Sequence, residues 1–411
     1  MPGELSSPLL LATGGDRMRR AKNRKGSGRK EAQLKTETDK IEQCGCRPGM
    51  EEKAKERFGE KREDFMIERI DYFIKSGNIV IYRCYGEGSV LELPGEIEGL
   101  PVTELADHCF APEASLRYPH QELYRACRRQ RMIRSQEEDA ESWQRVINEP
   151  EQEEKLQVYP ALAGEKISEI LLPQGVEVIG DYGFYGCRSL KRLVIPGSLK
   201  RLGGGAFVAC NHIQEICFFT KEETIPECVK DVVAELSYEI EMSVENEKGE
   251  LLVRLTYPEY YEESIENTPA RIIEIAYHGM GYKYRQCFQN RKIDFRQYDS
   301  LFALATVQEF VPTLLKLSLN RLCAPMELTE ENRKRYLQWL QKEHKSVARK
   351  LMEEDEMNLL RLLGSQEYFT KEILEVFLEA ASRAGRPEAV SYLMEYRHKY
   401  FPPEKKKKYE F

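Results

Sequence analysis

The histidines and acidic residues are the first candidates for catalytic or metal-binding chemistry in this chain. None of the six histidines stands at zinc-site spacing from a second histidine or a glutamate; they are His108, His120, His212, His278, His344 and His398. The sequence also lacks a Gly-x-Ser-x-Gly turn, a phosphate-binding loop and a kinase signature. The acidic run at 353–356 is explained by a helix start and a solvated face. We therefore predict no catalytic residue, no metal site and no cofactor, and hence a protein that is not an enzyme.

The cysteines give the second set of candidates. There are 11, an odd number scattered along the chain, which favours a reducing compartment over a disulfide framework. Cys44-Gly-Cys46 has the wrong spacing for a zinc knuckle. Cys187 and Cys210 lie 23 residues apart, and we predict a buried ladder of small side chains there. A redox pair or a metal clip is the alternative for these two.

Tyrosines and arginines gather between residues 277 and 298, where a Gly-x-Gly sequence also occurs. Gly279 and Gly281 lack the remaining glycine spacing of a phosphate-binding site, so we predict a tight turn. Tyrosine and arginine are the residues favoured at the energetic centres of protein interfaces. The possible interface consists of Tyr277, Tyr282, Tyr284, Arg285, Arg291, Arg296 and Tyr298. Ordinary packing is the alternative, and an enzyme or regulator with its site in 230–300 also stays open.

Length and charge limit the class of protein. A chain of 411 residues predicts two to three domains, and a net charge of −7 argues against a dedicated nucleic-acid binder. No apolar stretch reaches the roughly 18–20 residues that cross a bilayer. A short apolar run at 8–12 is followed by basic residues instead of preceded by them, which is the wrong order for a secretory signal. We expect a cytoplasmic protein, with the cell surface as the alternative.

A repeat with a period of 23 residues organises the middle of the chain. Three copies of an apolar pattern occur, beginning Ile167-x-x-Ile170-x-Leu172, Leu190-x-x-Leu193-x-Ile195 and Ile213-x-x-Ile216-x-Phe218. Further positions repeat at the same offset, Val176, Ile179, Gly180 and Phe184 returning as Leu199, Leu202, Gly203 and Phe207. A looser copy precedes them at Leu91, Leu93, Leu105, Cys109 and Phe110. Each period predicts a short strand and a turn that must stack on its neighbours to bury its apolar face.

These residues resemble a known family. The pattern LPxGVxxIGxxxFxGCxxL from Leu172 to Leu190, and the phrase GLPVTEL at 99–105, look like the BspA-type leucine-rich repeats of bacteria. The resemblance implies a right-handed solenoid with a binding role, through protein–protein contact or surface adhesion, and no catalytic residues.

The fold class expected from these patterns is α+β, a short leucine-rich-repeat solenoid with an N-terminal β cap, a β-hairpin and a C-terminal helical region. The expected segments are a disordered charged tail at 1–64, a β-meander cap with the first repeat at 65–111, an inserted helical and polar segment at 112–166, repeats at 167–230, a hairpin with an irregular module at 231–298 and a helical domain at 299–411. The inserted helix rests on Trp143, Val146 and Ile147, which fall on one possible helical face. A basic cluster at 17–30 is predicted to be solvated, with contact to nucleic acid or acidic lipid as the alternative.

The helical region carries predicted caps and a second, weaker repeat. Thr329, Asp355 and Thr370 are expected to be N-caps. Apolar positions of 347–363 return 30 residues later, and 380–390 resembles the helical part of an ankyrin unit without its usual opening. The two repeated regions together predict a non-enzymatic scaffold for an unknown protein partner. A surface adhesin of the BspA type is the alternative, and neither the partner nor the oligomeric state is encoded in a pattern that we can interpret.

Overall fold

A computed structural model describes residues 66–113, 122–129, 142–145, 159–267 and 272–402. All of the described residues belong to one compact unit. Several sequence predictions therefore lie outside the described residues: the tail at 1–64 with its basic cluster and Cys44-Gly-Cys46, as well as His120, Val146 and Ile147.

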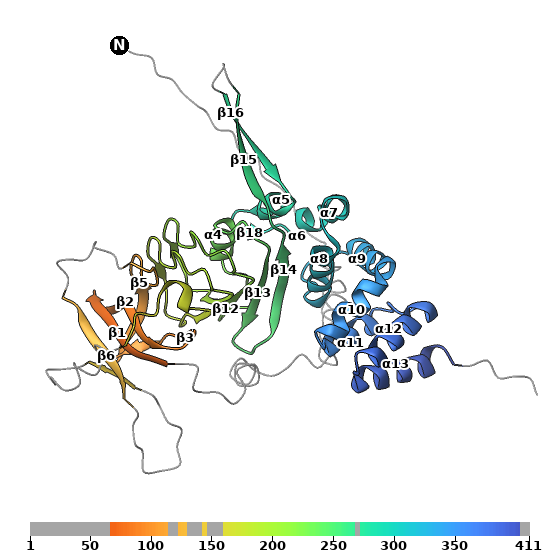
Figure 1. Ribbon diagram of the computed structural model, residues 1–411, viewed down its shortest axis with the longest axis horizontal. Coiled ribbons are helices and arrows are strands. Elements are labelled where there is room, and N and C mark those ends of the chain that lie inside the picture. Colours follow the sequence, from red (N-terminus) through yellow and green to blue (C-terminus); the bar gives the residue numbers. More distant parts are fainter. Residues whose placement is uncertain (1–65, 114–121, 130–141, 146–158, 268–271, 403–411) are drawn as a thin grey trace, which may run out of the picture. The chain divides into compact units, whose positions relative to one another are not determined.

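A six-stranded sheet forms one wall of the solenoid, in the order β14-β13-β12-β10-β8-β3 (Figure 1). Its strands are β3 (Val90–Glu92), β8 (Glu169–Leu171), β10 (Arg192–Pro196), β12 (Glu215–Thr220), β13 (Ile240–Asn246) and β14 (Leu251–Tyr257). All neighbours pair in parallel except β13 and β14. One apolar residue per strand stands directly opposite the next, and all of these residues are buried: Leu91, Ile170, Leu193, Ile216, Met242 and Leu255. The predicted α+β solenoid is confirmed.

An eight-stranded sheet forms a second wall and the N-terminal cap, in the order β11-β9-β5-β2-β1-β6-β7 with β4 paired to β5. Its strands are β1 (Met66–Lys75), β2 (Asn78–Glu87), β4 (Glu96–Ile97), β5 (Leu100–Leu105), β6 (Tyr124–Arg129), β7 (Ser142–Arg145), β9 (Val178–Ile179) and β11 (Arg201–Leu202). The β1–β2 hairpin joins the coil strands through parallel pairing of β2 with β5. Of the segment predicted as a β-meander cap with the first repeat, β1 and β2 form the cap hairpin, whereas β3 pairs with β8 in the other wall and begins the coils.

The inserted segment contains strands where we predicted a helix. Trp143 lies in β7, which pairs with β6, and β6 in turn pairs with β1. Hence β6 and β7 extend the cap sheet. Too few residues of this polar segment are apolar for periodicity to separate a helix from a short strand, so the predicted helix is wrong at 142–145.

A stack of phenylalanine rings fills the coils. Phe184 is fully buried between Phe110 and Phe207, with ring centroids 5.5 Å from each and nearly parallel planes. The looser first copy of the repeat therefore belongs to the same array. Since one coil cannot bury such rings alone, stacking of neighbouring coils holds the solenoid together.

The segment after the repeats combines short helices with three hairpins. The elements are α4 (Cys228–Ala234), the β13–β14 hairpin, β15 (Tyr261–Asn267) with β16 (Ile272–His278), α5 (Gly281–Arg285), and β17 (Phe288–Gln289) with β18 (Lys292–Ile293). The hairpin predicted around residue 248 is confirmed and closes the parallel sheet. Part of the irregular module predicted within 231–298 is regular, because β15 and β16 form an antiparallel pair there.

Eight helices make up the C-terminal region as described: α6 (Phe295–Ser300), α7 (Phe302–Gln308), α8 (Val311–Cys323), α9 (Glu330–Lys342), α10 (His344–Glu353), α11 (Met357–Ser365), α12 (Lys371–Arg383) and α13 (Pro387–Tyr400). Thr329 and Thr370 are N-caps whose side chains accept a backbone N–H, as predicted. Asp355 is not a cap, since it takes a φ of +56° in the turn and α11 begins two residues later.

The second, weaker repeat of the sequence corresponds to two equivalent turns between helices. Asp355 and Gly385, 30 residues apart, both have positive φ. The next residue of each turn donates its N–H to an equivalent carbonyl, Glu356 to Leu351 and Arg386 to Ala381. These are paired helices, and nothing here identifies them as an ankyrin fold.

Helix α8 fastens the helical region to the sheet. Thr313 and Asn320 donate hydrogen bonds to the outward-facing Glu239 and Glu241 at 2.5 and 2.9 Å, and Asn320 also bonds Thr256 at 2.9 Å. Arg321 of the same helix is fully buried and makes two hydrogen bonds to Asp299, at 2.8 and 3.1 Å. Among the residues that the structure describes, no helix has the length and apolar character that crossing a bilayer requires.

Candidate protein interface

One corner of the solenoid places equivalent residues of successive coils in a left-handed backbone conformation. The φ angles are +57° at His108, +56° at Tyr182 and +63° at Gly205. A hydrogen-bond ladder holds this corner, because the Asp107 carboxylate accepts the N–H of Asp181 at 2.8 Å. The Asp181 carboxylate accepts the N–H of Gly204 at 3.0 Å. Each coil therefore fixes the turn of the next.

The corner exposes aromatic rings. The His108 ring lies on Tyr182 with centroids 5.1 Å apart, and Tyr182 meets Tyr185 edge-on at 6.0 Å. Tyr182 and Tyr185 are each about 40% exposed and Val208, on the next coil, is 46% exposed. We name His108, Tyr182, Tyr185 and Val208 the aromatic corner.

Two glycines make room for this corner. A side-chain carbon on Gly205 would lie 2.7 Å from the Tyr182 ring, so the ring rests over that glycine. A carbon on Gly203 would lie 2.3 Å from the Gly180 carbonyl carbon, a distance at which neighbouring coils cannot stack. The glycines thus let Tyr182 spread across the following coil.

The outward face of the six-stranded sheet carries a row of charged residues. Glu169, Arg192 and Glu215 stand opposite one another on β8, β10 and β12, and Arg192 pairs with both carboxylates. The row continues to Glu241 on β13, which contacts Arg254 at 3.6 Å and Lys316 at 3.3 Å. Burial alone would raise the pKa of Glu241, but the Asn320 hydrogen bond and these two cations outweigh it and lower that pKa. The charges are paired internally, and α8 covers the end of the row.

The repeat pattern and the stacked coils can be compared with known repeat families. Residues 159–233 match the family model described as "BspA type Leucine rich repeat region (6 copies)". The match spans about a fifth of the chain and supports the predicted leucine-rich repeats. No curated protein and no solved structure matches the chain. The first of the described coils lies outside the match, since β3 and β5 precede residue 159.

The structure separates the Tyr/Arg cluster that we predicted as a possible interface. Tyr284 and Tyr298 are fully buried and Arg285 is 5% exposed, so these three are core residues, which corrects the prediction for them. Tyr298 donates its hydroxyl to the Thr256 carbonyl at 2.6 Å. The ring of Tyr284 meets that of Tyr298 edge-on at 4.7 Å.

Arg285 is an internal anchor. Its guanidinium donates to the backbone carbonyls of Val233, Tyr238, Pro258 and Gly281 at 3.3, 2.6, 2.5 and 3.1 Å. Burial lowers the pKa of Arg285 to about 10. The arginine therefore ties α4, β14 and α5 together at the base of the β15–β16 hairpin.

The remaining members of the cluster are exposed or half-buried. Tyr277 and Tyr282 stack with centroids 3.7 Å apart, Arg296 is exposed, and Arg291 pairs with Glu227 at 3.4 Å and with Asp231. The cluster is thus not one surface. The predicted tight turn is present, because Gly279 has a φ of +86° and Gly281 begins α5.

The thiol ladder is present as predicted. Cys187 and Cys210 are buried free thiols, which donate to the carbonyls of Phe110 and Phe184 at 3.4 and 3.0 Å. The hydrogen bond with Cys210, together with burial, raises the pKa of the Cys187 thiol, so it stays protonated. Within the described ranges no three His, Cys, Asp or Glu residues gather as metal ligands.

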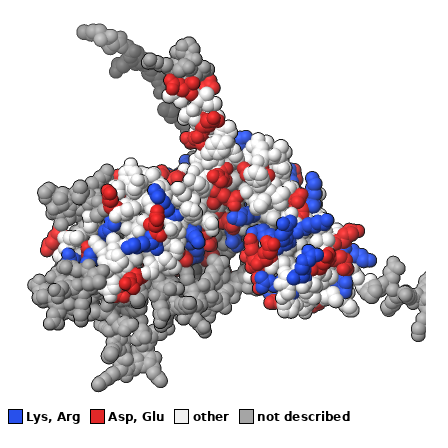
Figure 2. All heavy atoms as spheres, in the orientation of Figure 1, with Lys and Arg blue, Asp and Glu red and all other residues white. Residues whose placement is uncertain are grey.

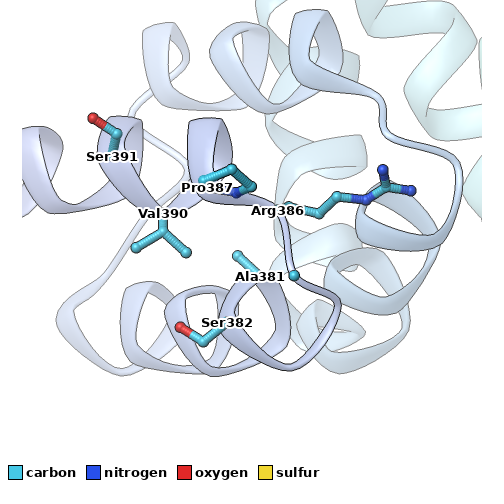
Figure 3. Close-up of a pocket in the computed structure, with 7 residues that line it drawn as sticks. Ala381, Ser382, Arg386, Pro387, Val390 and Ser391 are labelled. Atoms are coloured by element: carbon cyan, nitrogen blue, oxygen red, sulfur yellow. The ribbon is translucent and has the colours of Figure 1, made fainter.

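A shallow depression of about 540 Å³ lies at the turn between α12 and α13 (Figure 3). It is lined by Ala381, Ser382, Gly385, Arg386, Pro387, Val390 and Ser391. The Arg386 side chain extends away from Val390, donating to the Met352 carbonyl and to Asp355 at 3.0 Å each. Its charge is therefore used to join the two helical repeats.

The aromatic corner was missed at the sequence level, although a signal existed. Aligning the coils places Tyr182 where the next coil has Gly205, a glycine position occupied by an aromatic residue. An aromatic residue at such a glycine position is exposed and has a strained backbone. The periodicity of apolar residues alone does not reveal such a residue.

Proposed function

We propose that the protein is a non-enzymatic interaction scaffold that binds a protein partner through the aromatic corner. The observation that carries this proposal is the contact of three rings from two successive coils, the half-buried His108 and the exposed Tyr182 and Tyr185, with His108 and Tyr182 at left-handed positions. Non-glycine residues there cost about 1–3 kcal/mol each, a cost that persists where the surroundings enforce it and often marks a functional position.

The chemistry of the corner suits a protein surface. Tyrosine combines a large rigid ring with a hydroxyl, and it is enriched where interfaces gain most of their binding energy. The His108, Tyr182 and Tyr185 rings are in contact with one another on the coil, so little side-chain freedom is lost when a partner binds.

A cytoplasmic location is part of the proposal, supported by the described cysteines. These are all free, and seven are buried: Cys84, Cys109, Cys187, Cys210, Cys217, Cys228 and Cys287. Free buried thiols suit a reducing compartment. A bacterial source and an ankyrin-like tail remain proposals that rest on sequence resemblance. Cell fractionation separates this proposal from the surface adhesin, which would appear at the cell envelope.

The test is affinity purification from cells with the full chain and paired variants. Tyr182→Asn with Tyr185→Ser removes two rings, and asparagine tolerates the left-handed conformation. Tyr400→Ser is the control, because Tyr400 is 52% exposed on α13, away from the corner. We expect at least one protein that binds the wild-type chain and the control with purified components but not the corner variant. Equal binding by all three proteins would refute the proposal.

A further inference from the structure

The β15–β16 hairpin is a two-stranded sheet with both outer edges unpaired among the described residues (Figure 1). Two-stranded hairpins are marginally stable in water, and a third strand or a packing surface usually completes them. This one is fixed at its base. Tyr277 stacks on Tyr282, and a side-chain carbon on Gly279 would lie 2.6 Å from the Glu259 carbonyl oxygen, so the chain passes very close there.

The two faces and two strands of the hairpin differ in chemistry. On one face β16 presents Ile273, Ile275 and Tyr277, which are 68%, 55% and 40% exposed. Opposite them on the same face, β15 presents Glu266, Ser264 and Glu262. The apolar column therefore runs along β16 alone, next to its free edge.

The hairpin is also acidic (Figure 2). Its described residues include four glutamates, Glu262, Glu263, Glu266 and Glu274, and no lysine or arginine. Glu263 contacts His278 at 2.8 Å, whereas Glu262, Glu266 and Glu274 make no ion pair with any described residue. A strand lying along β16 would meet the apolar column on one face and Glu274 on the other.

We propose that the free edge of β16 binds an extended segment of a partner protein in which apolar residues alternate with lysine or arginine. The partner would add a third strand, gaining backbone hydrogen bonds from the edge and packing from Ile273, Ile275 and Tyr277. Lysine or arginine on its other face would neutralise Glu274. A second copy of this hairpin is a poorer occupant, because its described residues include no lysine or arginine that could neutralise Glu274. This surface is separate from the aromatic corner, so either proposal can fail without the other.

The experiment uses the full chain and labelled synthetic peptides, with binding measured by fluorescence anisotropy. The probe alternates valine and lysine, one control alternates valine and glutamate, and another is the valine–lysine peptide with alternate amides N-methylated. We expect only the unmethylated valine–lysine peptide to bind, more weakly at high salt. Ile275→Thr should weaken that binding about five- to tenfold, and Glu274→Lys should shift the preference toward the glutamate peptide.

The matched control is Ile265→Thr, since Ile265 is 46% exposed on β15 and faces the other side of the sheet. It should leave peptide binding within about twofold of wild type, a difference below 0.5 kcal/mol. The proposal is overturned if neither charged peptide binds, if the methylated peptide binds as well as its parent, or if Ile265→Thr weakens binding as much as Ile275→Thr. Sedimentation showing a dimer that Ile275→Thr dissociates would make a second copy the occupant and also overturn it.

Discussion

Replacing the central ring of the phenylalanine stack tests whether contacts between coils stabilise the solenoid. Phe184 lies between two rings, whereas Phe207 has one ring contact among the described residues, with Phe184. Each aromatic pair contributes about 0.5–1.5 kcal/mol beyond burial. Phe184→Leu, which nearly conserves volume, should therefore cost about 1–3 kcal/mol from lost stacking, and Phe207→Leu about half as much. Phe184→Ala adds a cavity and should cost about 3–5 kcal/mol.

Urea unfolding followed by Trp143 fluorescence measures these losses, with Trp339→Phe removing the other tryptophan. Trp143 reports on the sheet that also contains the coil strands β5, β9 and β11. Phe310→Ala is the control, because Phe310 is 80% exposed and should leave the midpoint unchanged. Equal losses for Phe184→Leu and Phe207→Leu, or a loss below about 1 kcal/mol for Phe184→Ala, would show that the stack does not couple the coils.

Three further predictions concern backbone approach, acid stability and the internal anchor. Gly203→Ala should lower the free energy of unfolding, measured in urea, by at least about 2 kcal/mol. Gly204→Ala adds a carbon with nothing within 4 Å, so its free energy of unfolding should stay within about 0.5 kcal/mol of wild type. Equal effects of the two substitutions would contradict the close approach of the coils. Because the pKa of Glu241 is lowered in the folded state, its ionisation stabilises the fold at pH values above the pKa that Glu241 has in the unfolded chain, and this stabilisation is lost as pH falls through the folded-state pKa. Glu241→Gln should therefore reduce the loss of stability between about pH 5 and pH 3. Parallel curves of stability against pH for the two proteins would refute this. In Arg285→Lys the lysine cannot reach all four carbonyls, so the free energy of unfolding should fall by about 3 kcal/mol. Amide hydrogen exchange in β15 and β16 should become faster. Unchanged exchange there would show that Arg285 does not anchor the hairpin.

The sequence predicted the coils well because their positions repeat. Ile170, Leu193 and Ile216 recur at one interval and stand opposite one another in the sheet. Leu91 and Leu93 fit the looser copy of the repeat, but this copy does not follow the 23-residue interval, so the partner of β3 was harder to predict. A run such as Val90–Glu92 has strand character in either wall, and only the tertiary structure decides that it pairs with β8.

The Tyr/Arg cluster shows where residue type misleads. Arg285 is buried because its partners are backbone carbonyls, and carbonyls leave no trace in a sequence. The β15–β16 hairpin was missed for the opposite reason. Apolar residues alternate along β16 at Ile273, Ile275 and Tyr277, but β15 is rich in glutamate and lacks the apolar alternation by which a partner strand is recognised.

The hydrogen-bond ladder from Asp107 through Asp181 to Gly204 requires each coil to keep its full length. The first two of these coils each offer the following one an aspartate carboxylate and a phenylalanine ring, Asp107 with Phe110 and Asp181 with Phe184. Removal or duplication of a whole 23-residue unit would leave every rung in register. Loss of a single residue would displace ring, carboxylate and thiol together. Natural length variation in this array should therefore proceed in whole turns.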